Sequence, residues 1–139
     1  MTHPTKIVCI GRSFRAHAQE LGNAVPTAPI FFLKAPSARI ESGVAIELPQ
    51  ASAVVHHEAE AAVVRGARLR HGTRAEAEAA IEAWTVLNDV TARDLQAADK
   101  GRFTRAKGFD TFCPISSDRV APPSDWRACR IQGRVNGEL

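Results

Sequence analysis

The chain has 139 residues, of which 45% are hydrophobic and 24% charged, and its formal net charge is +3. This length and composition predict one folded domain and exclude an intrinsically disordered chain. Its basic residues are scattered rather than clustered, so nucleic acid is not an expected partner.

The cysteines and the opening segment indicate the compartment. Cys9, Cys113 and Cys129 are widely spaced and form no CxxC pair, which argues against a disulfide framework or a zinc knuckle. The start, MTHPTKIVCIG, lacks the apolar core of a signal peptide, and no apolar run reaches the roughly 18 residues of a membrane span. We therefore expect a cytoplasmic protein with no membrane partner.

The first third of the chain predicts two strands around a short helix. Residues 6–11 (KIVCIG) form a β-rich run that ends at a glycine, and residues 30–34 (IFFLK) form a second apolar run. Between them, residues 13–23 (SFRAHAQELGN) predict a short helix with Ser13 as its N-cap.

The middle of the chain predicts a helix, a strand and a second helix. Residues 73–84 (TRAEAEAAIEAW) open with Thr73 three residues before Glu76, the spacing of a capping box, and predict a helix. Residues 85–90 (TVLNDV) predict a strand, and residues 91–101 (TARDLQAADKG) a helix that begins at a threonine cap and ends at a glycine.

The remaining third predicts loops and then half of a hairpin. From residue 102 prolines punctuate the chain, which favours loops. Residues 130–135 (RIQGRV) predict a strand, and Asn136-Gly137 after it is the strongest short signal for a hairpin turn.

Two acids lie two residues apart in an apolar stretch, residues 55–64 (VHHEAEAAVV). Local propensity favours a helix here, in which Glu58 and Glu60 would point apart. In a strand they share a face with His56 while the apolar side chains fill the other face, so we prefer the strand. The alternative is a solvated helix with incidental acids.

Clustered carboxylates repel each other and favour a bound cation. Asp89 is the best third acid, because an unpaired aspartate within an apolar run is costly to bury and Thr91 is the better N-cap for the following helix. Glu58, Glu60 and Asp89 would suit Mg²⁺, Mn²⁺ or Ca²⁺. Zinc-protease chemistry is excluded because position 61 is not a histidine.

A general base is also available. His17 and Glu20 are three residues apart on the first predicted helix, hence on one face. A carboxylate beside an imidazole fixes its tautomer and raises its basicity.

Four segments in order, residues 6–23, 55–64, 88–96 (NDVTARDLQ) and 104–114 (TRAKGFDTFCP), resemble the fumarylacetoacetate hydrolase family. The similarity is greatest to its bacterial members and to the acylpyruvase and oxaloacetate decarboxylase branch. It implies an α+β, mainly β fold, a mixed β-roll with a few short helices, in which residues 1–139 are the N-terminal portion of a single catalytic domain.

The resemblance also implies roles for individual residues. Glu58, Glu60 and Asp89 would hold the divalent metal, and His17 with Glu20 would lie on a lid-like helix. The substrate would be faced by Arg93, Gln96 and Lys107, the last as a catalytic residue. Only the resemblance picks out Gln96 and Lys107, and it further implies a homodimer.

The implied reaction is metal-assisted cleavage of a carbon–carbon bond in a small 2-oxo acid, by hydrolysis of an acylpyruvate or fumarylacetoacetate-like diketo acid or by decarboxylation of oxaloacetate. Isomerisation of a hydroxydienoate in aromatic catabolism is equally compatible with these residues. An inactive, truncated metal-binding module is the alternative from another class, and a nucleic-acid binder is the third.

The chain departs from the family pattern at its end. Family members continue past the NGE turn with further strands and a Thr-Gly-rich loop that closes the site, and neither is present here. We therefore expect residues 1–139 to be marginally stable or self-associating through an exposed strand edge, and less active than a full-length relative.

Overall fold

The computed structural model describes residues 4–14 and 24–139 and confirms the α+β, mainly β class. Its strands are β1 (Ile7–Gly11), β2 (Ile30–Lys34), β3 (Arg39–Glu41), β4 (Val55–His56), β5 (Ala59–Arg65), β6 (Ile81–Asn88), β7 (Thr91–Ala92) and β8 (Cys113–Ile115). Its helices are α2 (Arg74–Ala79), α3 (Arg93–Ala98) and α4 (Thr104–Lys107), with 3₁₀ turns at Pro36–Ala38 and Trp126–Ala128. The helix predicted over residues 13–23 lies almost wholly outside the described residues.

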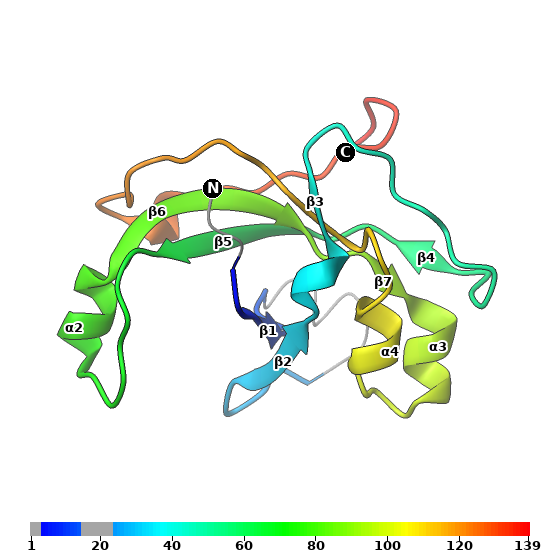
Figure 1. Cartoon of the computed structure of the whole chain (residues 1–139), viewed down its shortest axis with the longest axis horizontal. Coiled ribbons are helices and arrows are strands. Elements are labelled where there is room, and N and C mark those ends of the chain that lie inside the picture. Colours follow the sequence, from blue (N-terminus) through cyan, green and yellow to red (C-terminus); the bar gives the residue numbers. More distant parts are fainter. Residues whose placement is uncertain (1–3, 15–23) are drawn as a thin grey trace.

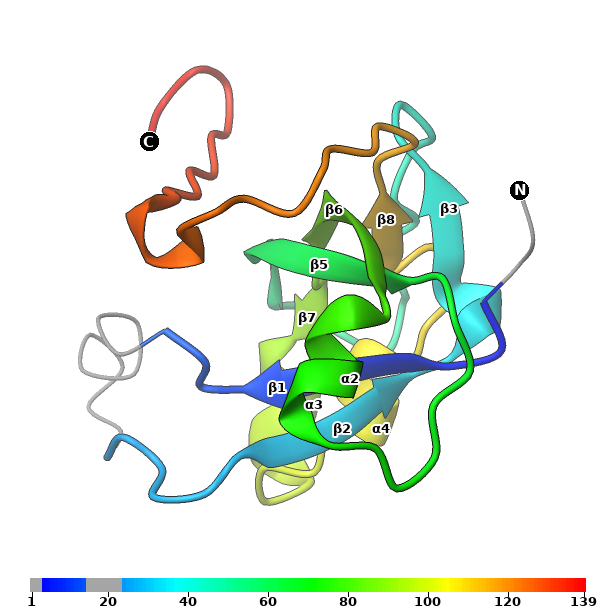
Figure 2. The same cartoon turned by 90° about the vertical axis from the view of Figure 1, so that its left-hand side faces the viewer.

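The strands form one sheet of four strands, in the order β3-β8-β6-β5, and two separate pairs, β1-β2 and β4-β7. The long β5–β6 hairpin curves over the β1–β2 pair, with α3 and α4 beside that pair (Figure 1). Seen from the side, the C-terminal segment runs on the opposite side of β5 from β1 and β2 (Figure 2). The sheets do not close on each other, so one face of the β5–β6 hairpin is covered only in part.

Strand β6 alternates between buried and exposed side chains, as a strand with one covered face does. Ala83, Thr85 and Leu87 are buried, whereas Val86 between them is exposed. This alternation, which places every second residue in the core, explains why the helix predicted over residues 73–84 is wrong in its second half: α2 ends at Ala79 and β6 begins at Ile81.

The two predicted helix starts have different outcomes. The capping box of α2 is confirmed, because the Glu76 amide donates to Thr73 Oγ1 at 3.3 Å and the Thr73 amide donates to Glu76 Oε2 at 2.7 Å. The N-cap predicted at Thr91 is wrong, because Thr91 belongs to β7 and the cap of α3 is Ala92, which makes no side-chain bond. The Thr91 hydroxyl instead takes part in the polar cluster described below.

The C-terminal third also differs from the prediction. Residues 102–117, expected as loop, contain α4 and β8. The strand predicted over residues 130–135 does not form: apart from one bridge at Val135, these residues pair with no strand that the structure describes. The Asn136-Gly137 turn does form, with φ of 53° and 85°, and closes a single bridge between Val135 and Glu138.

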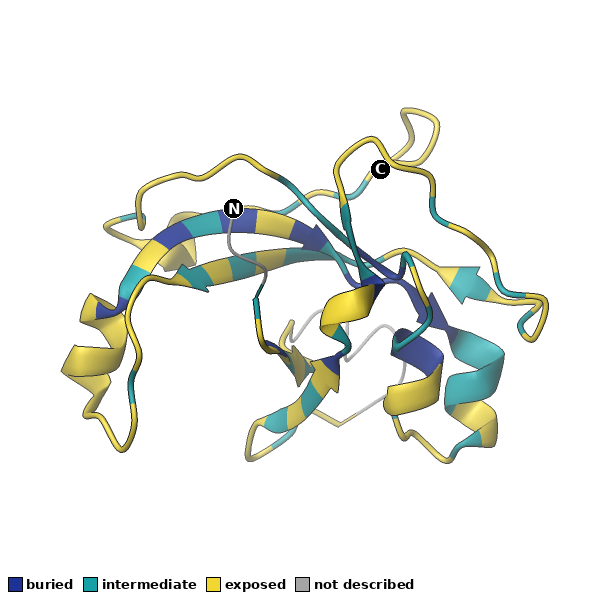
Figure 3. Cartoon of the chain, viewed as in Figure 1, coloured by how far each residue is buried: buried dark blue, intermediate teal, exposed yellow. Residues whose placement is uncertain are grey.

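The core is small, and its centre is polar. Figure 3 shows the buried positions concentrated along β6 and β7 and at the end of α4. One apolar cluster contains Leu87 and Cys113, and another contains Val90 and Phe112. Among the described residues, the largest fully buried side chains nevertheless include Lys34 and Thr91. No described helix is long and apolar enough to cross a membrane.

Candidate active site

Strand pairing brings the acids together. Strands β5 and β6 pair antiparallel with Ala59 opposite Asn88, so the residue before β5 meets the residue after β6. The Asp89 amide donates to the Glu58 carbonyl at 2.9 Å, and the Glu58 amide donates to Asn88 Oδ1 at 3.0 Å. Glu58 therefore lies in the break between β4 and β5 rather than within one continuous strand, and the solvated-helix alternative is wrong.

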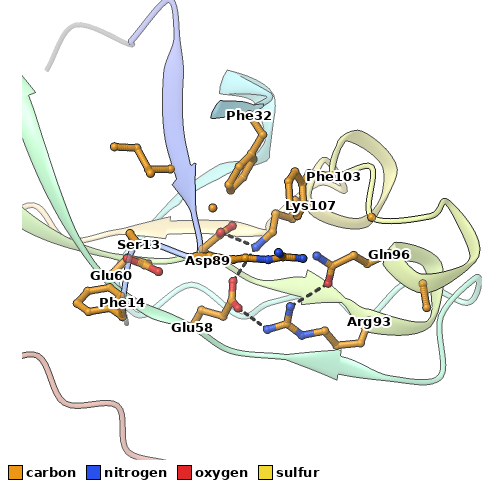
Figure 4. A pocket seen from close by; sticks show the side chains of 15 residues that line it. Ser13, Phe14, Phe32, Glu58, Glu60, Asp89, Arg93, Gln96, Phe103 and Lys107 are labelled. Atoms are coloured by element: carbon orange, nitrogen blue, oxygen red, sulfur yellow. Dashed lines mark hydrogen bonds and ion pairs between the residues drawn. The ribbon is translucent and has the colours of Figure 1, made fainter. Parts of the chain in front are cut away.

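Lys107, at the end of α4, lies between the two carboxylates that this pairing brings together (Figure 4). Its Nζ donates to Glu58 Oε2 at 2.6 Å, to Asp89 Oδ2 at 2.5 Å and to Thr91 Oγ1 at 2.7 Å. Its side chain is 4% exposed, so these contacts replace nearly all of the hydration of the ammonium group. The structure thus places the predicted residue Lys107 in contact with two of the three predicted acids, Glu58 and Asp89.

Each of the two carboxylates has a second cation. Lys34, the last residue of β2, donates to Asp89 Oδ1 at 2.6 Å and to the Val90 carbonyl at 3.2 Å. Arg93, the first residue of α3, pairs with Glu58 Oε1 and donates to Gln96 Oε1 at 2.9 Å. Lys34 was not among the predicted site residues, although a lysine at the end of an apolar strand is costly to bury without an acid near it.

The acids have opposite pKa shifts. Burial alone would raise the pKa of Glu58, but the charges and hydrogen bonds of Lys107 and Arg93 outweigh burial and lower it to about 2. Burial raises the pKa of Glu60 to about 7, and the charges of Glu58 and Asp89 add to the rise. Within residues 4–14 and 24–139 no hydrogen bond or ion pair reaches the Glu60 carboxylate. The cations around Glu58 therefore favour its ionised form, whereas the surroundings of Glu60 disfavour its ionised form.

These groups line one pocket of about 280 Å³. The polar residues that line it are Arg12, Ser13, Glu58, Glu60, Asp89, Arg93, Gln96 and Lys107. Its apolar side includes Phe32 and Phe103, whose ring centroids are 4.7 Å apart, and Lys107 Nζ lies 5.0 Å from the centre of the Phe32 ring. A pocket with charged residues on one side and aromatic rings on the other suits a small molecule that has an anionic end and an unsaturated or apolar end.

The donor set can be compared with the needs of a metal. Three carboxylates on one pocket are oxygen ligands of the kind that Mg²⁺, Mn²⁺ and Ca²⁺ prefer, and a bound cation would favour the ionised form of Glu60 that burial and its acidic neighbours disfavour. In the described part of the chain, no three histidine, cysteine or acidic side chains are already arranged to hold an ion. The chemistry of the residues therefore fits, provided that Lys107 moves from between Glu58 and Asp89.

The predicted base cannot be placed. His17 and Glu20 lie outside the described residues, so their roles stay predictions. The pocket is lined by Ser13 and Phe14, the residues that immediately precede that segment.

Two cysteines beside the polar cluster lead to a prediction about thiol reactivity. Burial, and next the charge of Asp89, raises the pKa of Cys9 to about 12, and burial raises the pKa of Cys113 to about 11, whereas Cys129 is exposed. Because the thiolate is the reacting form, we expect iodoacetamide at pH 8 to alkylate Cys129 alone in the native protein and all three thiols in urea. Peptide mass spectrometry measures this, with Cys129→Ser as the control. Equal native labelling of Cys9 and Cys129 would contradict the burial of Cys9.

Comparison with known proteins gives one consistent result. Residues 6–139 match the family model described as fumarylacetoacetate (FAA) hydrolase C-terminal. A mitochondrial oxaloacetate tautomerase of Arabidopsis thaliana is 49% identical over 116 residues, covering 81% of this chain and 52% of the relative. A mitochondrial oxaloacetate decarboxylase of Dictyostelium discoideum is 42% identical, covering 94% of this chain and 64% of the relative.

A solved structure of a similar protein also matches this chain. The 5-carboxymethyl-2-hydroxymuconate delta-isomerase of Mycobacterium smegmatis superposes with a TM-score of 0.76 at 40% identity, covering 88% of this chain and 48% of that chain. The chain spans about half the length of the curated relatives it matches.

Proposed function

Because this chain belongs to the fumarylacetoacetate hydrolase family, we propose that its pocket performs enolate chemistry on a small 2-oxo acid with the help of a divalent cation. The observation that carries the proposal is the convergence of Glu58, Asp89 and Lys107 in a pocket whose other side is aromatic. The reaction we propose first is cleavage of the carbon–carbon bond next to a carbonyl, by hydrolysis of an acylpyruvate-like diketo acid or by decarboxylation of oxaloacetate.

Glu58, Glu60 and Asp89 would hold the cation, with Mg²⁺ as the first candidate and Mn²⁺ or Ca²⁺ as alternatives. When bound, such an ion supplies positive charge that favours the enolate over the ketone. Lys107 and Arg93 would bind the carboxylate and the developing enolate oxygen of the substrate, since both donate N–H groups in the pocket. Gln96 holds the Arg93 guanidinium through its amide oxygen, and Phe32 and Phe103 would pack on the carbon skeleton.

His17, oriented by Glu20, would activate water for the hydrolytic reaction. Decarboxylation releases the same enolate without water, and tautomerisation needs only proton transfer. The second candidate is therefore a tautomerase or a hydroxydienoate isomerase, favoured by the names of the Arabidopsis and Mycobacterium relatives. Each of these reactions passes through an enolate of a 2-oxo acid: the cleavage reactions release it as the carbon–carbon bond breaks, whereas tautomerisation forms it by proton transfer on the intact substrate.

Turnover assays separate these candidates. With Mg²⁺ present, acetylpyruvate hydrolysis, loss of CO₂ from oxaloacetate and decay of enol-oxaloacetate are each followed by ultraviolet absorbance, with a full-length relative as the positive control. Metal-dependent turnover of one substrate supports the proposal and names the reaction. Metal binding without any turnover would instead support the inactive-module alternative.

Substitution of Glu60 tests the metal site directly. We expect Glu60→Gln to weaken Mn²⁺ binding by more than about tenfold, because it removes a pocket carboxylate that forms no ion pair with the described residues and would be available to a metal. Isothermal titration calorimetry measures the affinity, and Glu82→Gln on the exposed face of β6 is the matched control. Equal Mn²⁺ affinity in the two variants would remove Glu60 from the ligand set.

We also propose that the protein works as a homodimer in the cytoplasm. Large apolar side chains exposed on β1 and β2, among them Val8, Phe31 and Leu33, are compatible with self-association. Sedimentation velocity measures the state: a dimer at micromolar concentration supports the proposal, and a monomer there contradicts it.

A further inference from the structure

We propose that Lys34 is a positioning residue that keeps Asp89 neutralised when Lys107 leaves it. Lys107 would then be the exchangeable cation of the cluster, while Lys34 and Arg93 are its fixed counter-charges. The part of this inference that concerns a bound cation rests on the proposed function, whereas the pairing of charges does not.

Asp89 and Glu58 each contact Lys107 through one carboxylate oxygen and a second cation through the other oxygen. Asp89 receives Lys34 at Oδ1 and Lys107 at Oδ2. Glu58 receives Arg93 at Oε1 and Lys107 at Oε2. Lys107 is therefore shared, and each carboxylate has a second cation on its other oxygen. If Lys107 withdraws, neither carboxylate is left without a positive partner.

Lys34 differs from Lys107 because it does not line the pocket. Its side chain is 0% exposed, and it does not line the pocket, so it cannot contact a small molecule bound there. Its ammonium group depends on Asp89 and the Val90 carbonyl across 55 residues of sequence. On the same strand, Phe31 and Leu33 point outward and are exposed. Strand β2 thus places the positive charge of Lys34 next to Asp89, on the side of Asp89 that does not line the pocket.

Lys107, in contrast, lines the pocket, as Glu60 does. Its departure would remove the ammonium group from Glu58 Oε2 and Asp89 Oδ2, two oxygens from different carboxylates that converge on the place Lys107 Nζ occupies (Figure 4). Those oxygens are suitable donors for an incoming cation, and the freed ammonium could then bind an anionic substrate.

The cost of burying charge gives Lys34 its role. Asp89 is 5% exposed, and a buried carboxylate without a counter-charge is strongly unfavourable. Without Lys34, the departure of Lys107 would leave Asp89 in that state, so Lys107 would be held in place. Lys34 therefore lowers the cost of releasing Lys107 without touching the ligand.

A mutant cycle tests the pairing without metal or substrate. The melting temperatures of Lys34→Met, Lys107→Met and the double variant are compared, because methionine keeps the length of the stem and removes the charge. Since either lysine alone neutralises Asp89, we expect the double variant to lose about 10 °C more than the sum of the singles. Adding Asp89→Asn to the double variant should recover most of that extra loss, even if the double variant itself does not fold.

The control pair is Arg74→Met with Lys107→Met, because Arg74 is exposed and distant in the fold from the cluster, so its effect should be additive. Additive losses for Lys34 and Lys107, or no recovery with Asp89→Asn, would overturn the inference.

Mn²⁺ titration supplies the second measurement. Both single substitutions remove one positive charge next to Asp89, so a simple charge effect would strengthen Mn²⁺ binding in both. The inference predicts about a tenfold gain for Lys107→Met and no gain for Lys34→Met, in which Asp89 retains Lys107. An equal gain in both variants would overturn it. Absence of Mn²⁺ binding in every variant, including the unsubstituted chain, would contradict the proposed metal site and the exchange step, while the mutant cycle would still decide the pairing.

Discussion

Replacing Asp89 with alanine is expected to lower the free energy of unfolding by about 3–5 kcal/mol, because both Lys34 and Lys107 are left buried without the carboxylate they share. A typical domain is stable by only about 5–15 kcal/mol, so this loss is a large part of the total. Urea unfolding followed by tryptophan fluorescence and circular dichroism measures it. The same variant should bind Mn²⁺ far more weakly if Asp89 is a ligand.

Asp110→Ala is the matched control, because this aspartate is exposed and lies on the loop after α4. It should change the free energy of unfolding by less than about 0.5 kcal/mol. If Asp89→Ala is as stable as that control, the lysines must find other partners, and the charge cluster is not the centre of this fold. Unchanged Mn²⁺ affinity in a folded Asp89→Ala variant would separately remove Asp89 from the proposed ligand set.

The sequence predicted the acids of the site for a physical reason that the structure supports. An aspartate in an apolar run and two glutamates at strand spacing are costly to bury singly, and Glu58, Glu60 and Asp89 do line one pocket. Lys107, Arg93 and Gln96 line it too, but only the family resemblance pointed to Gln96 and Lys107. A lysine at the end of a four-residue helix carries no local signal of what it will meet.

The contacts of Lys34 and Thr91 could not be predicted from local sequence patterns, because their partners are distant in the sequence. Lys34 meets Asp89 because β2 ends beneath the point where β6 ends, and that depends on how separate sheets are placed. Thr91 looked like a helix cap because the chain after it is helical, yet one residue of difference in the start of α3 turns its hydroxyl toward Lys107 instead. The placement of the separate sheets decides the first contact and the β4–β7 pairing decides the second, so local propensity predicts neither.

The difference between local propensity and strand pairing also explains why the predicted helix over residues 73–84 was wrong in its second half and the predicted strand over residues 130–135 was wrong. Glutamate and alanine favour a helix through residue 84, but burial of alternate side chains on the sheet outweighs that propensity from Ile81 onward. Residues 130–135 have the composition of a strand, yet a strand needs a partner for its backbone groups. The turn at Asn136-Gly137 forms because its positive φ angles depend only on those two residues.

His17→Ala is expected to reduce kcat about 10²–10⁴-fold in the hydrolytic reaction, the usual contribution of a general base. The reason is chemical: its spacing from Glu20 suits an oriented imidazole, and among the pocket residues that the structure describes, none is a histidine. Because His17 is not an expected ligand, Mn²⁺ affinity and melting temperature should stay unchanged, and Glu20→Gln should give a smaller loss in kcat. His56→Ala, exposed on β4, is the control. Decarboxylation of oxaloacetate needs no activated water, so it should persist in His17→Ala; loss of Mn²⁺ binding in that variant would instead assign the histidine to the metal site.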